Sequence, residues 1–198
     1  TSDLDGNNLY IIPGWQNSNF SHLGWRDDSE FVIFSYKRAI GGRAFDAVSK
    51  GNGLGWLLKN GYRKFIKPFF PELVRNKIAS DNKYQIFHDR GSIRGSYPGG
   101  LLSNDGHPSF TSDGHYMLTD TYANSDGFRF LVLFDTQSKK SIELGRFFSP
   151  FNCCSYRCDL HPRFSRDNSM VIIDSAHSGR HQMLVLKLDW QGLCDFLS

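Results

Sequence analysis

The sequence predicts an all-β protein built from repeated antiparallel units, and three observations lead to this prediction. Short apolar runs with a period of two, bounded by turn residues, recur along the chain. Three segments of the chain align with one another without a gap. The hydrophobic content of 39% and charged content of 22% are typical of a folded soluble domain, and no apolar run is long enough to span a membrane.

The three aligned segments each begin with a histidine. They are HLGWRDDSEFVIFSY from His22, HPSFTSDGHYMLTDT from His107 and HPRFSRDNSMVIIDS from His161. In each segment an aromatic residue follows the histidine by three positions, and then come a polar turn and an apolar run that favours a strand. Aspartate suits such a tight turn, so we expect a structural role for Asp28, Asp113 and Asp167.

More strands follow the aligned segments. FRFLVLFD at 128–135 and HQMLVLKLD at 181–189 add a further strand after the second and third repeats, and SIELGRF at 141–147 adds a fourth after the second. Four antiparallel strands in about 40 to 50 residues are typical of one blade of a β-propeller. A β-sandwich is the alternative, but it does not explain the repeat. Because closed propellers need about 4 to 8 blades, we expect a partial ring or the carboxy-terminal part of a longer one.

Residues 44–80 interrupt this pattern. Their apolar spacing suits one or two short amphipathic helices broken by Pro68 and Pro71, and basic side chains are frequent. The sequence predicts a basic helical insertion between blades, either with a solvated charged face or as a lid or docking patch for an acidic polymer or membrane surface. YQIFHDR at 84–90 then returns to a strand and is expected to open the next blade.

The repeated histidines are the main candidates for chemistry. In a propeller blade the first strand lines the central channel, so equivalent positions at its start converge. The ends of the second strands and the loop before the third repeat are expected at the same mouth. Three imidazoles with a thiolate suit tetrahedral zinc, and imidazoles also suit manganese or iron. The predicted ligands are His22, His107, Cys158 and His161. Asp159 is a candidate for orienting a ligand imidazole. Alternatively, each histidine belongs to an entry turn and bonds a backbone carbonyl.

Charge and cysteine content limit which partners and which cellular compartment can be expected. A net charge of +3 is too small to favour nucleic acid but is compatible with an acidic substrate. Four cysteines do not form a disulfide framework for this length, and an adjacent Cys153–Cys154 bridge would be strained. Free thiols or a metal ligand are therefore favoured, and free thiols indicate the cytoplasm. No signal peptide is visible at the amino end.

DGHPSFTSDGHYMLTDTY and RCDLHPRFSRDNSMVIIDSAHSGRHQM resemble the metal-binding seven-bladed propellers of the oligogalacturonate lyase and ulvan lyase type. The resemblance covers residues 105–189 and extends weakly to residues 21–25. The chain is also similar to uncharacterised propeller proteins associated with bacterial surface-polysaccharide genes. The resemblance implies zinc or manganese as cofactor and an acidic, uronate-containing polysaccharide or oligosaccharide as partner. Such lyases are often exported, which makes the periplasm or secretion the alternative location.

The implied reaction is a β-elimination, which needs a group that neutralises the substrate carboxylate, a base and an acid. The candidates for neutralisation are Arg157, Arg163 and Arg180, and those for proton transfer are Tyr122 and His177. In part of this family the metal is structural. The alternative function is therefore a non-enzymatic propeller scaffold that docks a protein or glycan partner during polysaccharide assembly. If Cys158 and His177 both bind the metal, few groups remain for catalysis.

Overall fold

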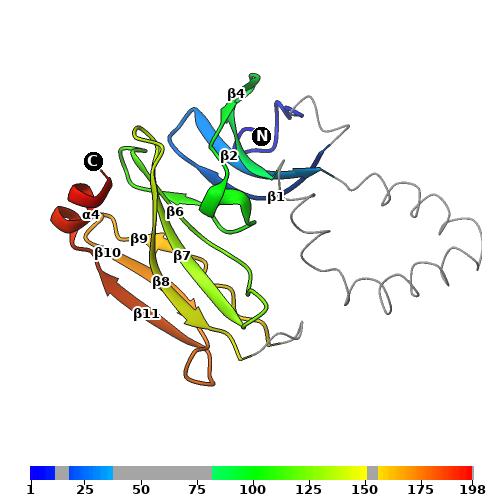
Figure 1. The fold of residues 1–198 in the computed structure, drawn as a ribbon. Helices are drawn as coiled ribbons and strands as arrows, with labels where there is room; N and C mark the ends of the chain where they lie inside the picture. The colour runs from blue at the N-terminus through cyan, green and yellow to red at the C-terminus, as the bar shows by residue number, and fades with distance from the viewer. Residues whose placement is uncertain (12–17, 38–81, 151–155, 198) are drawn as a thin grey trace, which may run out of the picture.

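A computed structural model describes residues 1–11, 18–37, 82–150 and 156–197 of the 198-residue chain. In these residues the chain forms three antiparallel β-sheets, one after another, and a short helix near the carboxyl end (Figure 1). Within each sheet, strands that are neighbours in sequence are hydrogen-bonded neighbours. The predicted antiparallel all-β character is confirmed for this part of the chain.

The three sheets are named A, B and C in chain order. Sheet A consists of β1 (Ser18–Trp25), β2 (Glu30–Lys37), β3 (Lys83–His88) and β4 (Ile93–Ser96). Sheet B consists of β5 (Ser109–Phe110), β6 (Tyr116–Asp120), β7 (Phe128–Asp135) and β8 (Ser141–Phe148). Sheet C consists of β9 (Arg163–Phe164), β10 (Met170–Ser175) and β11 (Gln182–Lys187). A 3-10 turn at Gly100–Ser103 precedes sheet B, and α4 (Trp190–Leu197) follows sheet C.

The strand β3 is confirmed, but its predicted place is wrong. It pairs antiparallel with β2, with Phe87 opposite Phe31, so it is the third strand of sheet A and does not open the next sheet. The helical insertion expected at 44–80 lies outside the described residues. The strands that precede and follow it in the described residues, β2 and β3, pair with each other in sheet A.

Sheet B lies between sheets A and C, and both of its faces are buried (Figure 1). Its innermost strand, β5, contacts both β1 and β9. Val132 and Phe134 of β7 pack toward sheet A, whereas Leu131 and Leu133 pack toward sheet C. Burying each such side chain contributes about 1.5–3 kcal/mol to folding. The strand β7 is therefore apolar on both faces, which explains its nearly continuous apolar sequence.

Polar bonds join equivalent parts of neighbouring sheets. In the turn between the first two strands, Arg26 Nε of sheet A donates to the Gly114 carbonyl of sheet B at 3.1 Å. The corresponding turn of sheet C reaches the same turn of sheet B, since Asn168 Nδ2 donates to Ser112 Oγ at 3.1 Å. The repeat in the sequence is thus also a repeat in space, with equivalent turns next to one another.

An aspartate closes each of these turns. Asp113 and Asp167 each accept a hydrogen bond from the backbone N–H two residues later, at 3.0 and 3.2 Å. In sheet A the bond is made by Asp27, at 2.7 Å, and not by the predicted Asp28. The turn of sheet A is one residue shorter than the other two. The gapless alignment therefore misplaces this aspartate by one position.

The turn of sheet C leads to a prediction about the pKa of Asp167 and the pH dependence of stability. Hydrogen bonds from Ser165 Oγ and from the Ser169 N–H and hydroxyl lower the pKa of Asp167 to about 2. A carboxyl group whose pKa is lowered by folding stabilises the fold at pH values above its unfolded-state pKa of about 3.8. This contribution is lost as the pH falls toward 2. We expect Ser165→Ala to raise the pKa of Asp167, as measured by carbon-13 NMR titration of the carboxyl groups. Asp113, in the equivalent turn, is the internal control. An unchanged Asp167 midpoint would contradict this cause.

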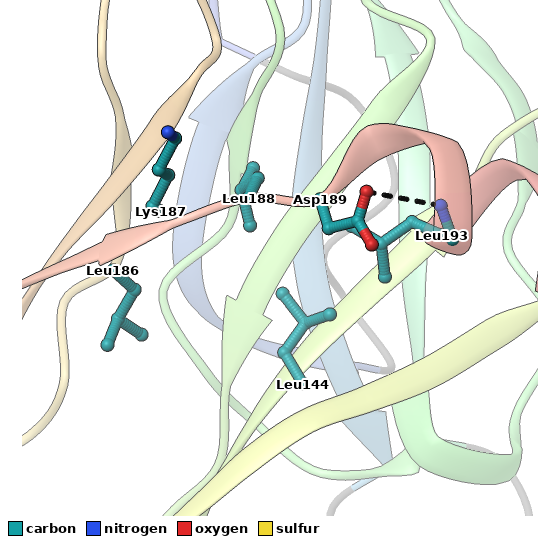
Figure 2. Close-up of a pocket in the computed structure, with 7 residues that line it drawn as sticks. Leu144, Leu186, Lys187, Leu188, Asp189 and Leu193 are labelled. Atoms are coloured by element: carbon teal, nitrogen blue, oxygen red, sulfur yellow. Dashed lines mark hydrogen bonds between the residues drawn. The ribbon is translucent and has the colours of Figure 1, made fainter.

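The helix α4 was not predicted from the sequence, and it packs against the end of sheets B and C. Trp190 Nε1 donates to the Asn168 carbonyl at 2.7 Å, and its ring lies 4.8 Å from the ring of Tyr116. Figure 2 shows the pocket beside α4, of about 340 Å³, with Leu144 of β8 and Leu193 of α4 in its wall. Its side chains are mainly aliphatic, so it offers little for catalysis. Within the described part of the chain, no helix has the length and apolar character needed to span a membrane.

Candidate functional site

Three histidines form a row where the inner ends of the sheets meet. His22 lies on β1, His107 lies just before β5 and His161 lies just before β9. The ring centroids of His22 and His107 are 4.0 Å apart, and those of His107 and His161 are 4.2 Å apart. The structure therefore brings together the three histidines that occupy equivalent positions in the sequence repeat. We call this arrangement the histidine row.

Two glycines allow the backbone to bring the histidine row together. A Cβ on Gly106 would lie 1.8 Å from the carbonyl oxygen of Asp120, so the chain entering His107 runs directly against the end of β6. A Cβ on Gly24 would lie 2.3 Å from the Pro108 carbonyl oxygen, so β1 runs equally close to the segment that leads into β5. Only glycine fits such close backbone approaches.

Each histidine of the row places Nδ1 against a carboxylate. A carboxylate partner fixes the orientation of an imidazole and leaves Nε2 for an ion or substrate. The pairs are His22 with Asp105 at 3.0 Å, His107 with Asp120 at 2.9 Å and His161 with Asp174 at 3.2 Å. The alternative expectation, in which each imidazole bonds a backbone carbonyl, is wrong for these Nδ1 atoms.

Asp120 is the polar centre of the junction between sheets B and C. Only 1% of it is exposed. Besides the imidazole, its carboxylate accepts the backbone N–H groups of His107 at 2.7 Å, Leu160 at 2.9 Å and His161 at 3.2 Å. Burial by itself would raise the pKa of Asp120, but the hydrogen bonds and charge of His107 and the N–H of His161 outweigh it and lower the pKa. Asp120 thus holds two of the three histidines in place.

One group of metal-ligand type occurs among the residues that the structure describes. Single ligand atoms of His107, Asp159 and His161 all lie within 4.8 Å of one another. Two imidazoles and a carboxylate suit zinc, manganese or ferrous iron. Asp159, expected to orient a ligand, is a member of the group itself, whereas His22 is the neighbour of His107 in the histidine row. The ligand roles of these residues stay predictions.

Cys158, the remaining predicted ligand, is buried beside this group without belonging to it. Its Sγ lies 3.9 Å from the Asp159 carbonyl oxygen. Burial, and then the charge of Asp174, raise the pKa of the Cys158 thiol. Because the thiolate is the form that binds metal, a thiol that keeps its proton is a weaker ligand than the imidazoles.

Asp159 also holds two arginines. Arg129, on β7, is 2% exposed and pairs through Nη1 with Asp159 Oδ1. Arg157 Nη2 lies 2.9 Å from Asp159 Oδ2. Four carboxylates and two guanidinium groups surround the row: Asp105, Asp120, Asp159 and Asp174, with Arg129 and Arg157. The carboxylates outnumber the guanidinium groups by two, which favours a cation at this place.

Arg157 and Tyr122 lie next to the histidine row, whereas the roles predicted for them in handling the substrate stay predictions. The Arg157 guanidinium carbon is 5.0 Å from the centroid of the Tyr122 ring, and this ring is 6.1 Å from that of His22. Burial, followed by the charges of Asp105 and Asp159, raises the pKa of Tyr122. Its hydroxyl therefore keeps its proton at neutral pH. A cavity of about 430 Å³ is lined by Arg157 together with Asp159 and His161.

The other three predicted catalytic residues are not brought to the row. Arg163 is exposed on β9, and its Nη1 donates to the carbonyl of the preceding residue at 3.0 Å. Arg180 and His177 are exposed in the connection between β10 and β11. His177 Nδ1 bonds Ser175 Oγ at 2.9 Å and lies 3.4 Å from Nε2 of Gln182, a residue that lines the cavity.

Sequence reasoning missed Asp105 and Arg129. The sequence does contain a signal for Asp105, because Asp-x-His-Pro occurs at 105–108 and again at 159–162. In the structure, each of these aspartates lies near the histidine of the preceding sheet: Asp105 bonds His22, and Asp159 is grouped with His107. Arg129 has no local signal, since it lies in an otherwise apolar strand.

Comparisons with known proteins add little to this site. No protein-family model matches the chain, and no curated protein matches it. Among solved structures, the chain is similar to the crystal structure of TolB from Acinetobacter baumannii, with a TM-score of 0.45 and 12% sequence identity. The alignment covers 88% of this chain and 44% of that one, so the chain spans less than half the length of this neighbour. The function of the present chain is therefore inferred from its own residues.

Proposed function

We propose that the chain is part of a β-propeller that holds a divalent metal ion through His107, Asp159 and His161 and that acts on or recognises an acidic, uronate-containing polysaccharide or oligosaccharide. The observation that carries the proposal is the convergence of these three ligand atoms within 4.8 Å, with each imidazole oriented by a carboxylate. The donor set, and the excess of carboxylates over guanidinium groups around it, suit zinc or manganese.

The propeller is supported by the arrangement of the sheets. Their first strands lie side by side, with β5 between β1 and β9. The outer faces of the end sheets keep large apolar side chains exposed, such as Leu23 and Trp25 on sheet A and Met183 and Val185 on sheet C. Further sheets packed on these faces would bury them and complete the ring.

A polysaccharide lyase reaction is the enzymatic form that fits these groups. Arg157 would neutralise the substrate carboxylate. His22, whose Nδ1 is held by Asp105, would take the proton beside that carboxylate. The electron pair of the broken C–H bond would form a C=C bond and expel the glycosidic oxygen, which the protonated Tyr122 hydroxyl suits as an acid. An ion, when bound, would further polarise the carboxylate.

The second candidate is a structural metal in a non-enzymatic propeller that docks a protein or glycan partner. It is favoured by the origin of the ligands, because His107 precedes sheet B whereas Asp159 and His161 precede sheet C. An ion held by all three would tie the two sheets together. In that case the ion would stabilise the fold without taking part in a reaction.

Elemental analysis of the purified protein tests the metal site. We expect near-stoichiometric zinc or manganese in the wild type and none in the His107→Ala, His161→Ala double variant. His115→Ala is the matched control, because His115 Nε2 makes the same kind of bond, to Asp135 at 3.0 Å, outside the row. No bound metal in the wild type, even after addition of zinc or manganese, would contradict the proposal.

A second measurement separates the two candidates. Ultraviolet absorbance of unsaturated uronate products should appear with the metal-loaded protein and be lost in Tyr122→Phe. A metal that raises the melting temperature, with no unsaturated product from any uronate polymer tested, would favour the structural role.

A further inference from the structure

Both carboxylate oxygens of Asp159 lie beside arginines. Arg129 Nη1 forms an ion pair with Oδ1, which accepts no hydrogen bond from the described residues, and Arg157 Nη2 lies 2.9 Å from Oδ2. Asp159 is also the carboxylate of the group that it forms with His107 and His161. A carboxylate oxygen can hold more than one partner, but a metal ion on either oxygen of Asp159 would lie beside one of the two guanidinium groups, and the two positive charges would repel each other.

The two arginines differ in their freedom to move. Arg129 is buried, and its Nη1 also lies 3.4 Å from the carbonyl oxygen of Thr121. The Arg157 side chain is 48% exposed and lines the 430 Å³ cavity. Separating a buried guanidinium from its carboxylate leaves an uncompensated charge, whereas an exposed one is solvated by water. Oδ2, the oxygen held by Arg157, is thus the one open to exchange.

We propose that a divalent metal ion and the Arg157 guanidinium compete for Asp159 Oδ2, so that metal binding releases Arg157 toward the cavity. This inference rests on the metal site of the proposed function. The released guanidinium keeps its place on the Tyr122 ring and gains free N–H donors. These donors then face the cavity, where they can bind the carboxylate of an acidic ligand. Metal loading thereby prepares the site for an anion.

The test is the zinc affinity of the full chain, measured by isothermal titration calorimetry with zinc chloride alone. Arg157→Gln removes the competing charge, and we expect it to bind zinc about tenfold more tightly. Arg163→Gln is the matched control, since it removes the same charge from an exposed position on β9. Because the Arg163 guanidinium does not bond Asp159, we expect the zinc affinity of Arg163→Gln to change by less than about twofold.

A spectroscopic measurement follows the release itself. In nitrogen-15 NMR of the wild type, the Arg157 side-chain resonance should shift on zinc addition with the same midpoint as zinc binding. The Arg163 resonance should stay in place.

The possible outcomes separate this inference from the proposed function. Unchanged or weaker zinc binding by Arg157→Gln would overturn the competition and leave the metal site standing. Equal tightening in both variants would reveal a general effect of net charge and would also overturn the competition. If the wild type binds neither zinc nor, in the same titration with manganese chloride, manganese, the metal site and the competition are both wrong.

Discussion

Asp120→Ala should lower the free energy of unfolding by about 4 kcal/mol. The carboxylate is 1% exposed and accepts the imidazole of His107 and three backbone N–H groups, from His107, Leu160 and His161. Without it, buried donors from two sheets lose their partner, and each unsatisfied donor costs about 1–3 kcal/mol. Because Asp120 takes backbone N–H groups both from the segment entering sheet B and from the segment entering sheet C, its loss should loosen this junction.

Urea denaturation of the wild type and the variant measures this loss. Asp174→Ala is the control, because Asp174 makes a similar bond to His161 but has a side chain that is 49% exposed. An exposed pair contributes about 0–1 kcal/mol, so we expect a small effect there. Asp120→Asn keeps one acceptor oxygen, so its loss of unfolding free energy should lie between those of Asp120→Ala and Asp174→Ala. Equal losses for Asp120→Ala and Asp174→Ala would show that Asp120 is not the centre of the junction.

Gly106→Ala is expected to cost about 3 kcal/mol and to abolish metal binding. The added Cβ would lie 1.8 Å from the Asp120 carbonyl oxygen and 2.8 Å from Thr119 Oγ1. The first contact is with backbone, so no rotamer change relieves it. Either the end of β6 or the segment entering His107 must move. Each movement separates His107 from the Asp120 carboxylate that orients it.

Gly95→Ala provides the matched control, because a Cβ at this position of β4 meets nothing within 4 Å. Both variants can be compared by thermal unfolding and by their content of bound zinc or manganese. Gly95→Ala should behave like the wild type in both measurements. A Gly106→Ala protein that unfolds at the wild-type temperature and keeps its metal would show that the close approach at this glycine is not needed.

Much of the strand pattern could be predicted from the sequence. The run at 128–135 is a strand with the predicted bounds, and the apolar run that ends the third repeat forms β10, because period-two apolar patterns and turn residues are local signals. The pairing of β3 could not be predicted in this way, since its partner β2 precedes it by more than 40 residues of different composition. The eight-residue helix α4 carries too short a pattern to distinguish it from a strand or loop.

For the candidate site, too, one part could be predicted from the sequence and another part could not. By itself, the sequence determined the three equivalent histidines, because a repeat places equivalent residues at equivalent points of equivalent sheets. It also pointed to Arg157 and Tyr122 beside them. Only the tertiary structure decided which carboxylate faces which imidazole. His22 meets Asp105 from the next sheet, and Asp159 meets Arg129 from inside β7. These pairs join distant parts of the chain through packing between sheets. The repeated Asp-x-His-Pro marks Asp105 and Asp159 in the sequence, but it does not show which side chains they meet.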